Sequence, residues 1–434
     1  MTNRLRVATC IGLALCLAHT VPAPAQAPGV PYNPYTAKPA APAFNPYTGA
    51  GAGRGPNPFT GASGSPPINP YTGKPMTIPD RYNPLTGGPA KGAEPPSAAP
   101  AVLARKVPIS GKAGPGLDVL DEAILSVMDH HGIPGAALAI AKNGKLVYAK
   151  GFGWADLAAG AAVEPFTIFG LASCSKPITA LAILALIEQG KLNLDDRAFD
   201  ILNHITAPRG VRVDPRIATI TIRQLLNHSG GWDRSKSGDL MNQSPLIARR
   251  LGVPMPLTED QFLSYLLTVP LDFNPGAQMQ YSNNGYIALG RIVEKVSGMS
   301  YERFIQENIL KPAGVRAVYL NHGAGRYKAG EAHSYVAGAA TELPPMDLRL
   351  IKAAAGWNAS AVDLTRLLTA LDGSRGKAAL QGTTFQQMLA LPPPPLAVQG
   401  TARTPAWAGP PRSLEPKGSS VTSTTASYSA CARS

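Results

Sequence analysis

Two residues at helical spacing, Ser173 and Lys176, could provide a nucleophile and the group that accepts its proton. They stand at the start of a strongly apolar stretch that continues to residue 187, and this pattern predicts a buried helix beginning at Ser173. At positions i and i+3 the hydroxyl and the amine share one helix face. The positive potential of a helix N-terminus would stabilise a developing alkoxide and a charged acyl transition state. The same spacing recurs at Ser374 and Lys377, but no apolar helix follows there, so we interpret that copy as coincidental.

A second pair of polar side chains, Tyr281 and Asn283, precedes another predicted helix over residues 285–296. A phenol beside an ammonium can have its pKa lowered enough to act as a general base, and an amide side chain can orient the amide of a substrate. The alternative for Tyr281 is a buried tyrosine that caps a loop. The histidines have no metal-ligand spacing, and the sequence contains neither a phosphate-binding loop nor a Gly-x-Ser-x-Gly elbow. The sequence therefore predicts no metal and no cofactor.

The elements expected to position these residues form a mixed domain. An amphipathic helix over residues 117–130 precedes two β-compatible runs, 136–142 and 145–151, and the Asn143-Gly144 pair between them is a strong hairpin signal. The helix that carries Ser173 is expected over residues 173–189, and residues 195–310 are predicted to be largely helical with long loops. We therefore expect an α+β fold in which an antiparallel sheet is flanked by helices and carries a helical insertion.

Composition divides the 434 residues into a globular part and two flanks, because 43 prolines and 44 glycines are too many for one compact domain. Residues 1–25 contain two arginines, an apolar run and small residues, which predict a secretory signal peptide. Residues 26–115 repeat an Asn-Pro-x-Thr pattern, mostly with an aromatic third residue, at spacings of 12, 12, 12 and 14. This segment predicts a disordered linker or, alternatively, a tether whose aromatics dock on glycan or protein. Residues 116–391 would form the folded domain, and residues 392–434 an aberrant or disordered tail.

The formal net charge of +13 is concentrated outside the expected domain. Residues 26–116 carry +6, whereas residues 117–399 carry only +2. This distribution does not favour nucleic-acid recognition and instead predicts loose attraction of the basic flanks to anionic cell-wall or membrane surfaces. The alternative is a solvated linker without a partner.

Six segments in a fixed order give the chain a resemblance to the serine β-lactamase and penicillin-binding-protein family, especially its class C and esterase-like branch. They are the hairpin 136–151, the Ser173 motif, and residues 225–231, 273–276, 281–283 and 355–363. The resemblance implies a β-lactamase/transpeptidase-like fold with Ser173 as the acylated nucleophile. It implies Lys176 and Tyr281 as the proton-handling pair and Asn283 as a substrate-positioning group. The implied oxyanion hole combines the Ser173 N–H with an N–H from a late strand.

The expected late strand is where the sequence departs from the family pattern. That strand carries Lys-Thr-Gly or His-x-Gly in the family, and the residues after 391 contain neither. We therefore expect the C-terminal part of the sheet to be missing through truncation or a frameshift, with a lineage-specific disordered tail as the alternative.

The sequence accordingly predicts an exported serine hydrolase, periplasmic or extracellular, that acts through an acyl-serine intermediate. Its substrate would be an ester, a β-lactam or a D-amino-acid peptide, including peptidoglycan-derived ones. The alternative is a catalytically impaired, cell-wall-associated binding protein of the same family. The sequence favours no particular oligomeric state.

Overall fold

The computed structural model describes residues 16–17, 106–315, 317–321, 323, 325–336, 340–371 and 380–389. The expected tail and most of the expected signal peptide and repeat segment lie outside these residues, as do Ser374 and Lys377. Those assignments therefore remain predictions.

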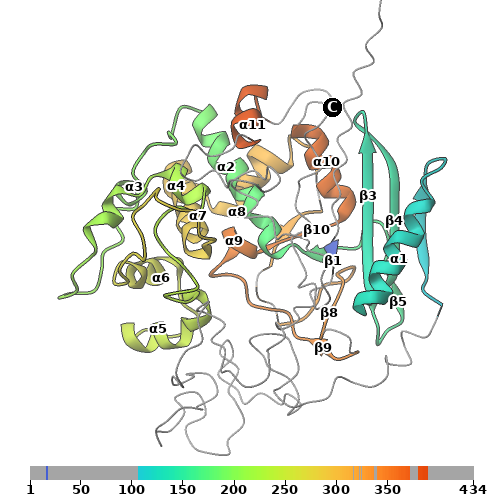
Figure 1. Ribbon diagram of the computed structural model, residues 1–434, viewed down its shortest axis with the longest axis horizontal. Helices are drawn as coiled ribbons and strands as arrows, with labels where there is room; N and C mark the ends of the chain where they lie inside the picture. The colour runs from blue at the N-terminus through green and yellow to red at the C-terminus, as the bar shows by residue number, and fades with distance from the viewer. Residues whose placement is uncertain are drawn as a thin grey trace, which may run out of the picture.

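The largest sheet stands at one side of the described part and is antiparallel throughout (Figure 1). Its strand order is β1-β3-β4-β2, with β5 paired to β4. The strands are β1 (Cys16–Leu17), β2 (Ile109–Ala113), β3 (Gly135–Lys142), β4 (Lys145–Asp156) and β5 (Ala161–Ala162). Asn143 and Gly144 connect β3 to β4 and both have positive φ, as the tight turn of a twisted hairpin requires. The predicted hairpin is therefore confirmed, with longer strands than the sequence indicated.

Strand β2 extends the folded part toward the N-terminus. It pairs with β4 from Ile109 opposite Phe152 to Ala113 opposite Tyr148, so the sheet begins before residue 116, where the sequence analysis placed the start of the domain. The strand has no alternation of apolar residues, and backbone hydrogen bonds to β4 hold it in place. A strand of this composition gives no periodic signal in the sequence.

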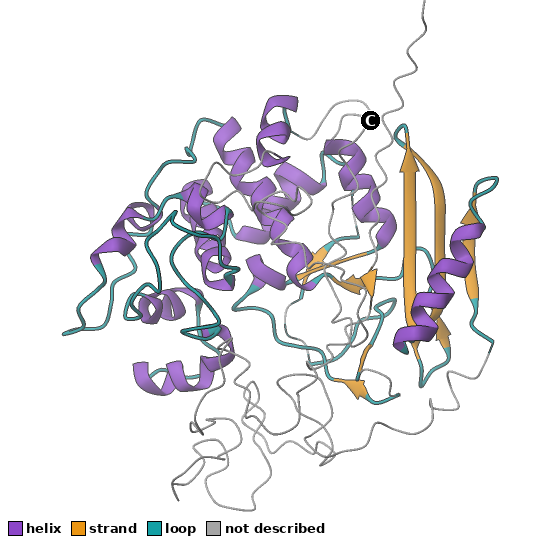
Figure 2. Ribbon diagram, viewed as in Figure 1, coloured by secondary structure: helices purple, strands orange, loops and turns teal. Residues whose placement is uncertain are grey.

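The central strand β3 is buried on both faces and separates two layers of helix (Figure 2). Leu138 and Ile140 pack in one apolar cluster with helix α1 (Val119–His131). Ala137 and Ala139 point the other way and pack against helix α10 (Ala361–Leu371). Successive side chains of a strand alternate between faces, so one strand serves both layers. The α+β fold with a helix-flanked antiparallel sheet is confirmed.

The helical part is built around α2 (Lys176–Glu188), which is buried on nearly all sides. A helix that is apolar all round belongs in an interior, and α2 packs against α7 (Asn283–Ser297), α8 (Tyr301–Ile305) and α9 (Lys352–Ala355). The other helices are α3 (Ala198–Ile201), α4 (Ile222–Leu226), α5 (Ser244–Leu251), α6 (Glu259–Leu266) and α11 (Gly382–Leu389). Short 3-10 or π turns are η1 (Ala172–Ser175), η2 (Pro215–Thr219), η3 (Leu240–Gln243) and η4 (Gln306–Leu310). The helical insertion expected from the sequence is therefore confirmed.

Two small sheets lie between the helical part and the large sheet (Figure 2). One has the order β6-β10-β7 and contains β6 (Phe169–Gly170), β10 (Trp357–Ala359) and β7 (Tyr319–Leu320). The other is a pair formed by β8 (Ser334–Tyr335) and β9 (Glu342–Leu343). Among the described residues, no helix is both long and apolar enough to cross a membrane.

Candidate active site

Ser173 lies in a short turn that leads directly into helix α2. The 3-10 turn η1 carries it, so α2 starts at Lys176 and not at Ser173, as the sequence had suggested. Ala172 opens the turn with φ 43°, a left-handed conformation that residues with a Cβ rarely adopt. Strand β10 holds the turn, because the backbone N–H of Trp357 donates to Ser175 Oγ at 3.0 Å. The nucleophile candidate is thus placed by a strained backbone that a strand from far along the chain supports.

The Ser173 hydroxyl lies between two of the residues singled out in the sequence. Tyr281 Oη donates to Ser173 Oγ at 2.6 Å, and Lys176 Nζ lies 3.2 Å from the same oxygen. Ser173 itself is half-buried, whereas Lys176 is only 1% exposed. The structure therefore brings Ser173, Lys176 and Tyr281 together in one cluster.

Lys176 has an environment suited to a neutral amine. Burial lowers its pKa to about 7, although the Asp239 carboxylate opposes this shift. Its Nζ lies 2.8 Å from Asn283 Oδ1 and 2.9 Å from the carbonyl oxygen of Ala354. A neutral amine can donate its two N–H groups to these two oxygens and direct its lone pair at Ser173 Oγ. This arrangement equips Lys176 to accept the serine proton.

Tyr281 has the opposite shift from the one expected. Burial raises its pKa to about 12, outweighing the hydrogen bond to Ser173 and the nearby Arg234, which both lower it. The guanidinium of Arg234 lies 5.3 Å from the centre of the Tyr281 ring, and Lys176 Nζ lies 4.7 Å from it. The expectation of a lowered phenol pKa is therefore wrong, because loss of hydration dominates at this position. Tyr281 is a hydrogen-bond donor to Ser173 near neutral pH.

Asn283 uses both ends of its amide within the protein. Its Oδ1 accepts from Lys176, and its Nδ2 donates to Asp239 Oδ2 at 2.7 Å. The amide therefore holds Lys176 in place in this arrangement. Its use as a substrate-positioning group remains a prediction.

Sequence reasoning did not identify Asp239 or Ala354 as parts of this cluster. Asp239 lies in a long loop without a motif, just before η3. Ala354 contributes through its backbone carbonyl, which leaves no trace in residue type. Only the position of residue 354 beside the family-like segment 355–363 could have indicated it.

His228 organises the loop that precedes Tyr281. Its Nδ1 accepts from the Ser282 backbone N–H at 3.2 Å, and its ring centre lies 4.7 Å from that of Tyr281. Burial, together with the positive charge of Lys176, lowers the pKa of His228 to about 3, so the ring is neutral at physiological pH. A neutral ring places no further positive charge beside Lys176.

The expected oxyanion hole has two backbone donors, the Ser173 N–H and an N–H from a late strand, and the described residues include only the first. Ser173 lies near the start of a helical run, where backbone N–H groups lack intrahelical partners. The second donor was expected from a late strand of the large sheet. Across the described residues the last strand is β10, and it pairs with β6 and β7 in a separate sheet.

Known proteins share this sequence pattern and fold. Protein flp from Staphylococcus aureus strain MRSA252 is 34% identical over 182 residues, which make up 42% of this chain and 33% of flp. The chain thus matches about a third of the length of that relative. The octameric penicillin-binding protein homologue from Pyrococcus abyssi has a TM-score of 0.53 at 29% identity, over 63% of this chain and 60% of that chain. EstCE1, a hydrolase with promiscuous acyltransferase activity, has a TM-score of 0.50 at 26% identity, over 62% and 75% of the two chains.

The sequence model of the β-lactamase family matches residues 120–420, more than half of the 434 residues. The match includes Ser173, Lys176, Tyr281 and Asn283, and it continues past residue 391, where the sequence analysis ended the domain. Together with the helix-flanked antiparallel sheet, this match identifies the family. The chain belongs to the β-lactamase family of serine hydrolases.

Proposed function

We propose that this protein is an exported hydrolase that forms an acyl-enzyme at Ser173 with an ester, a β-lactam or a D-amino-acid peptide. The observation that carries the proposal is the position of Ser173 Oγ, 2.6 Å from the Tyr281 hydroxyl and 3.2 Å from a lysine amine whose pKa is about 7. A serine is a weak nucleophile unless an adjacent base accepts its proton. Lys176 supplies that base.

The proposed acylation starts from neutral Lys176. Its lone pair takes the Ser173 proton as Oγ attacks the substrate carbonyl, and the new ammonium remains hydrogen-bonded to Asn283 Oδ1 and the Ala354 carbonyl. Tyr281 donates to the developing charge on Oγ and then gives its proton to the leaving group. Lys176 returns a proton to Tyr281, and water subsequently hydrolyses the acyl-serine. Positive potential at the start of η1 and α2 stabilises the tetrahedral oxyanion.

The substrate range is supported by the chemistry named for similar proteins. The similar structures are described as a penicillin-binding protein homologue and as a hydrolase with promiscuous acyltransferase activity. Both descriptions are compatible with a carbonyl substrate that acylates a serine. Ester, lactam and peptide substrates all fulfil this requirement.

Covalent labelling tests the proposal. The full chain is treated with a fluorescent fluorophosphonate and, separately, with a fluorescent penicillin, and the modified residue is identified by mass spectrometry. We expect labelling at Ser173 that Ser173→Ala abolishes and that Ser374→Ala, in the second Ser-x-x-Lys, leaves unchanged. Labelling that survives Ser173→Ala would exclude Ser173 as the nucleophile.

A second candidate is a cell-wall-associated binding protein whose catalysis is impaired. The observation that favours it is the composition of the large sheet, which contains no described strand after β5. The described residues therefore provide no late strand to supply the second oxyanion donor. Loss of one such donor commonly lowers turnover about 10²–10³-fold. Rapid labelling of Ser173 combined with negligible steady-state hydrolysis of a chromogenic ester or cephalosporin would favour this candidate. Cell fractionation tests the export that both candidates require.

A further inference from the structure

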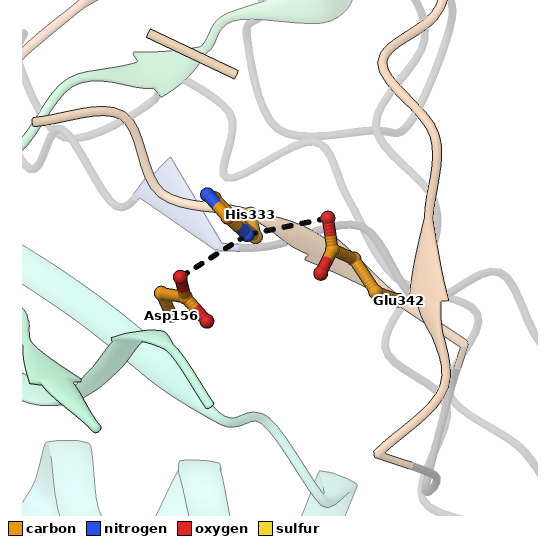
Figure 3. A group of neighbouring side chains, drawn as sticks. All are labelled: Asp156, His333 and Glu342. Carbon is orange, nitrogen blue, oxygen red and sulfur yellow. Dashed lines mark ion pairs between the residues drawn. The ribbon is translucent and has the colours of Figure 1, made fainter. Parts of the chain in front are cut away.

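Three potential metal ligands from separate segments meet at the end of strand β4. They are Asp156, the last residue of β4, His333, which directly precedes β8, and Glu342, the first residue of β9. His333 Nδ1 lies 3.7 Å from Asp156 Oδ2 and 3.3 Å from Glu342 Oε1, and the three ligand atoms lie within 4.8 Å of one another. Figure 3 shows both carboxylates directed at the same ring nitrogen.

Asp156 is oriented by the turn that follows it. Its Oδ1 accepts from the backbone N–H groups of Ala158 at 2.8 Å and Ala159 at 3.1 Å. These two bonds fix the carboxylate and leave Oδ2 to face His333. The ligand atom is therefore placed by the backbone before any ion binds.

His333 is fixed through both its backbone and its ring. Its backbone N–H donates to the carbonyl of Ala155 at 2.7 Å, and its ring stacks on Tyr327 at 4.1 Å between centres and 15° between planes. The Tyr327 hydroxyl in turn donates to the Leu343 carbonyl and accepts from the Ser334 N–H, so it holds the strand pair β8–β9 beside the ring.

The Nδ1 atom of His333 is the unsatisfied group of this cluster. It is buried and has no hydrogen-bond partner of good geometry among the described residues, although two carboxylates lie nearby. A buried polar atom without a partner is uncommon and calls for a physical explanation. A metal ion between the nitrogen and the two carboxylates would satisfy all three groups.

We propose that Asp156, His333 and Glu342 form a binding site for a divalent transition-metal ion such as Zn²⁺. Ligands of a tetrahedral Zn²⁺ lie at about 2.0–2.2 Å from the ion and therefore about 3.3–3.6 Å from one another. The distances from His333 Nδ1 to the two carboxylates, 3.3 and 3.7 Å, fit that spacing with little rearrangement. Two carboxylates balance the charge of a divalent ion, and the imidazole favours Zn²⁺ over Mg²⁺ or Ca²⁺, which prefer oxygen ligands. Water would complete the coordination.

The site would join the β8–β9 pair to the large sheet. Asp156 belongs to β4, whereas the other two ligands flank or begin the two-residue strands β8 and β9. Such a short strand pair is weakly stable alone, and a bound ion would stabilise its attachment. This structural role is separate from the chemistry proposed at Ser173. The proposed site also departs from the sequence analysis, which found no metal-ligand spacing. Asp156 lies far along the chain from His333 and Glu342, so the three ligands form no local motif.

Zn²⁺ titration of the full chain, after treatment with a chelator and dialysis, tests the site. We expect one tightly bound ion per chain by calorimetry, an increase in the thermal unfolding midpoint on adding Zn²⁺, and little response to Mg²⁺ or Ca²⁺. His333→Ala should weaken Zn²⁺ binding at least about tenfold and remove the thermal response. His204→Ala is the matched control, because His204 Nε2 faces a single carboxylate, Asp260, at 3.9 Å. It should leave both readouts unchanged.

Two further substitutions test the site even if His333→Ala fails to fold. Glu342 is 41% exposed on its side chain, so Glu342→Gln should fold and yet bind Zn²⁺ more weakly. Asp156→Asn keeps an oxygen for the Ala158 and Ala159 N–H groups while removing the charge. The proposal is overturned if Zn²⁺ uptake is absent or is equal in the unsubstituted chain and these variants, because the three side chains then form ion pairs only.

Discussion

The protonation state of Lys176 links the geometry of the site to its chemistry. An ammonium at this position has three donors for three nearby oxygens, but it has no lone pair with which to accept the Ser173 proton. Burial makes the neutral amine accessible near physiological pH, and the Asn283 and Ala354 oxygens keep it directed at Ser173. Tyr281, with a raised pKa, cannot take this role without first losing a strongly held proton.

Acylation of Ser173 should therefore rise with pH around pH 7. Below the lowered pKa of Lys176 the amine is protonated and acylation is slow, and above it the neutral amine is available. The measurement is the rate of fluorophosphonate labelling between pH 5 and 9, a range that extends about two units on either side of that pKa. The rate is corrected for hydrolysis of the probe. A rate independent of pH, or one that rises only toward the pKa of Tyr281, would contradict the assignment of Lys176 as base.

Substitutions separate the contributions to this profile. Tyr281→Phe should lower the rate, by up to about 10²–10⁴-fold, and keep the inflection. Asp239→Asn should move the inflection to lower pH, because the Asp239 carboxylate raises the pKa of Lys176. Lys176→Ala should remove the inflection altogether.

At the scale of elements, the sequence predicted the helices and strands that local residue patterns determine. The β3–β4 hairpin has its Asn143-Gly144 turn, and α7 is close to its predicted range because Ser282 accepts from the Gly285 N–H and Gly298 ends the helix. Strand β2 and the η1 turn were not predicted. β2 depends on pairing with β4, and η1 depends on a hydrogen bond from Trp357, so neither leaves a periodic signal.

Within the site, too, features that depend on contacts distant in the sequence could not be predicted. Residue types indicated Ser173, Lys176, Tyr281 and Asn283, and the structure brings these four together. The direction of the pKa shift of Tyr281 could not be predicted, because it depends on how deeply the surrounding residues bury the phenol.

Helix α9 carries the Ala354 carbonyl that Lys176 contacts, and a buried ion-pair network holds this short helix. Lys352, its first residue, lies 2.6 Å from Glu259 Oε2 and 3.0 Å from Glu294 Oε1. Lys352→Met would leave the largely buried Glu259 without its cation, whereas Glu294 would keep its ion pair with Arg291. We expect it to lower the free energy of unfolding by about 2–4 kcal/mol and to slow labelling of Ser173 as the Ala354 carbonyl shifts. Urea unfolding and labelling rates measure the two effects.

Glu259→Gln is the matched comparison for Lys352→Met. Burial raises the pKa of Glu259 to about 7, so a neutral side chain costs little at this position and the amide should be tolerated better than loss of the Lys352 cation. Equal losses in the two variants would mean that the cation at residue 352 is not what holds α9.

At the scale of the whole molecule, the outer edge of β3 is only partly paired among the described residues. Strand β1 pairs with only Ala136 and Ala137, and it comes from the predicted signal peptide. Farther along, the Thr365 hydroxyl of α10 donates to the Ala139 carbonyl at 3.4 Å. An edge with free N–H and C=O groups is a template for pairing with another chain, so exposure of the β3 edge would favour self-association.

Export would remove the predicted signal peptide, residues 1–25, and deletion of these residues should therefore promote self-association. This deletion takes away β1, whereas the matched deletion of residues 1–14 keeps Cys16 and Leu17 and their pairing with β3. We expect the chain 26–434 to form larger species with increasing concentration, to melt at a lower temperature than the chain 15–434, and to turn over a chromogenic ester or cephalosporin slowly. Light scattering, thermal unfolding and steady-state assays measure these outcomes. If the chain 26–434 stays monomeric, melts sharply and turns over substrate rapidly, residues outside the described part cover the β3 edge and supply the second oxyanion donor, and the expectation of an incomplete sheet is wrong.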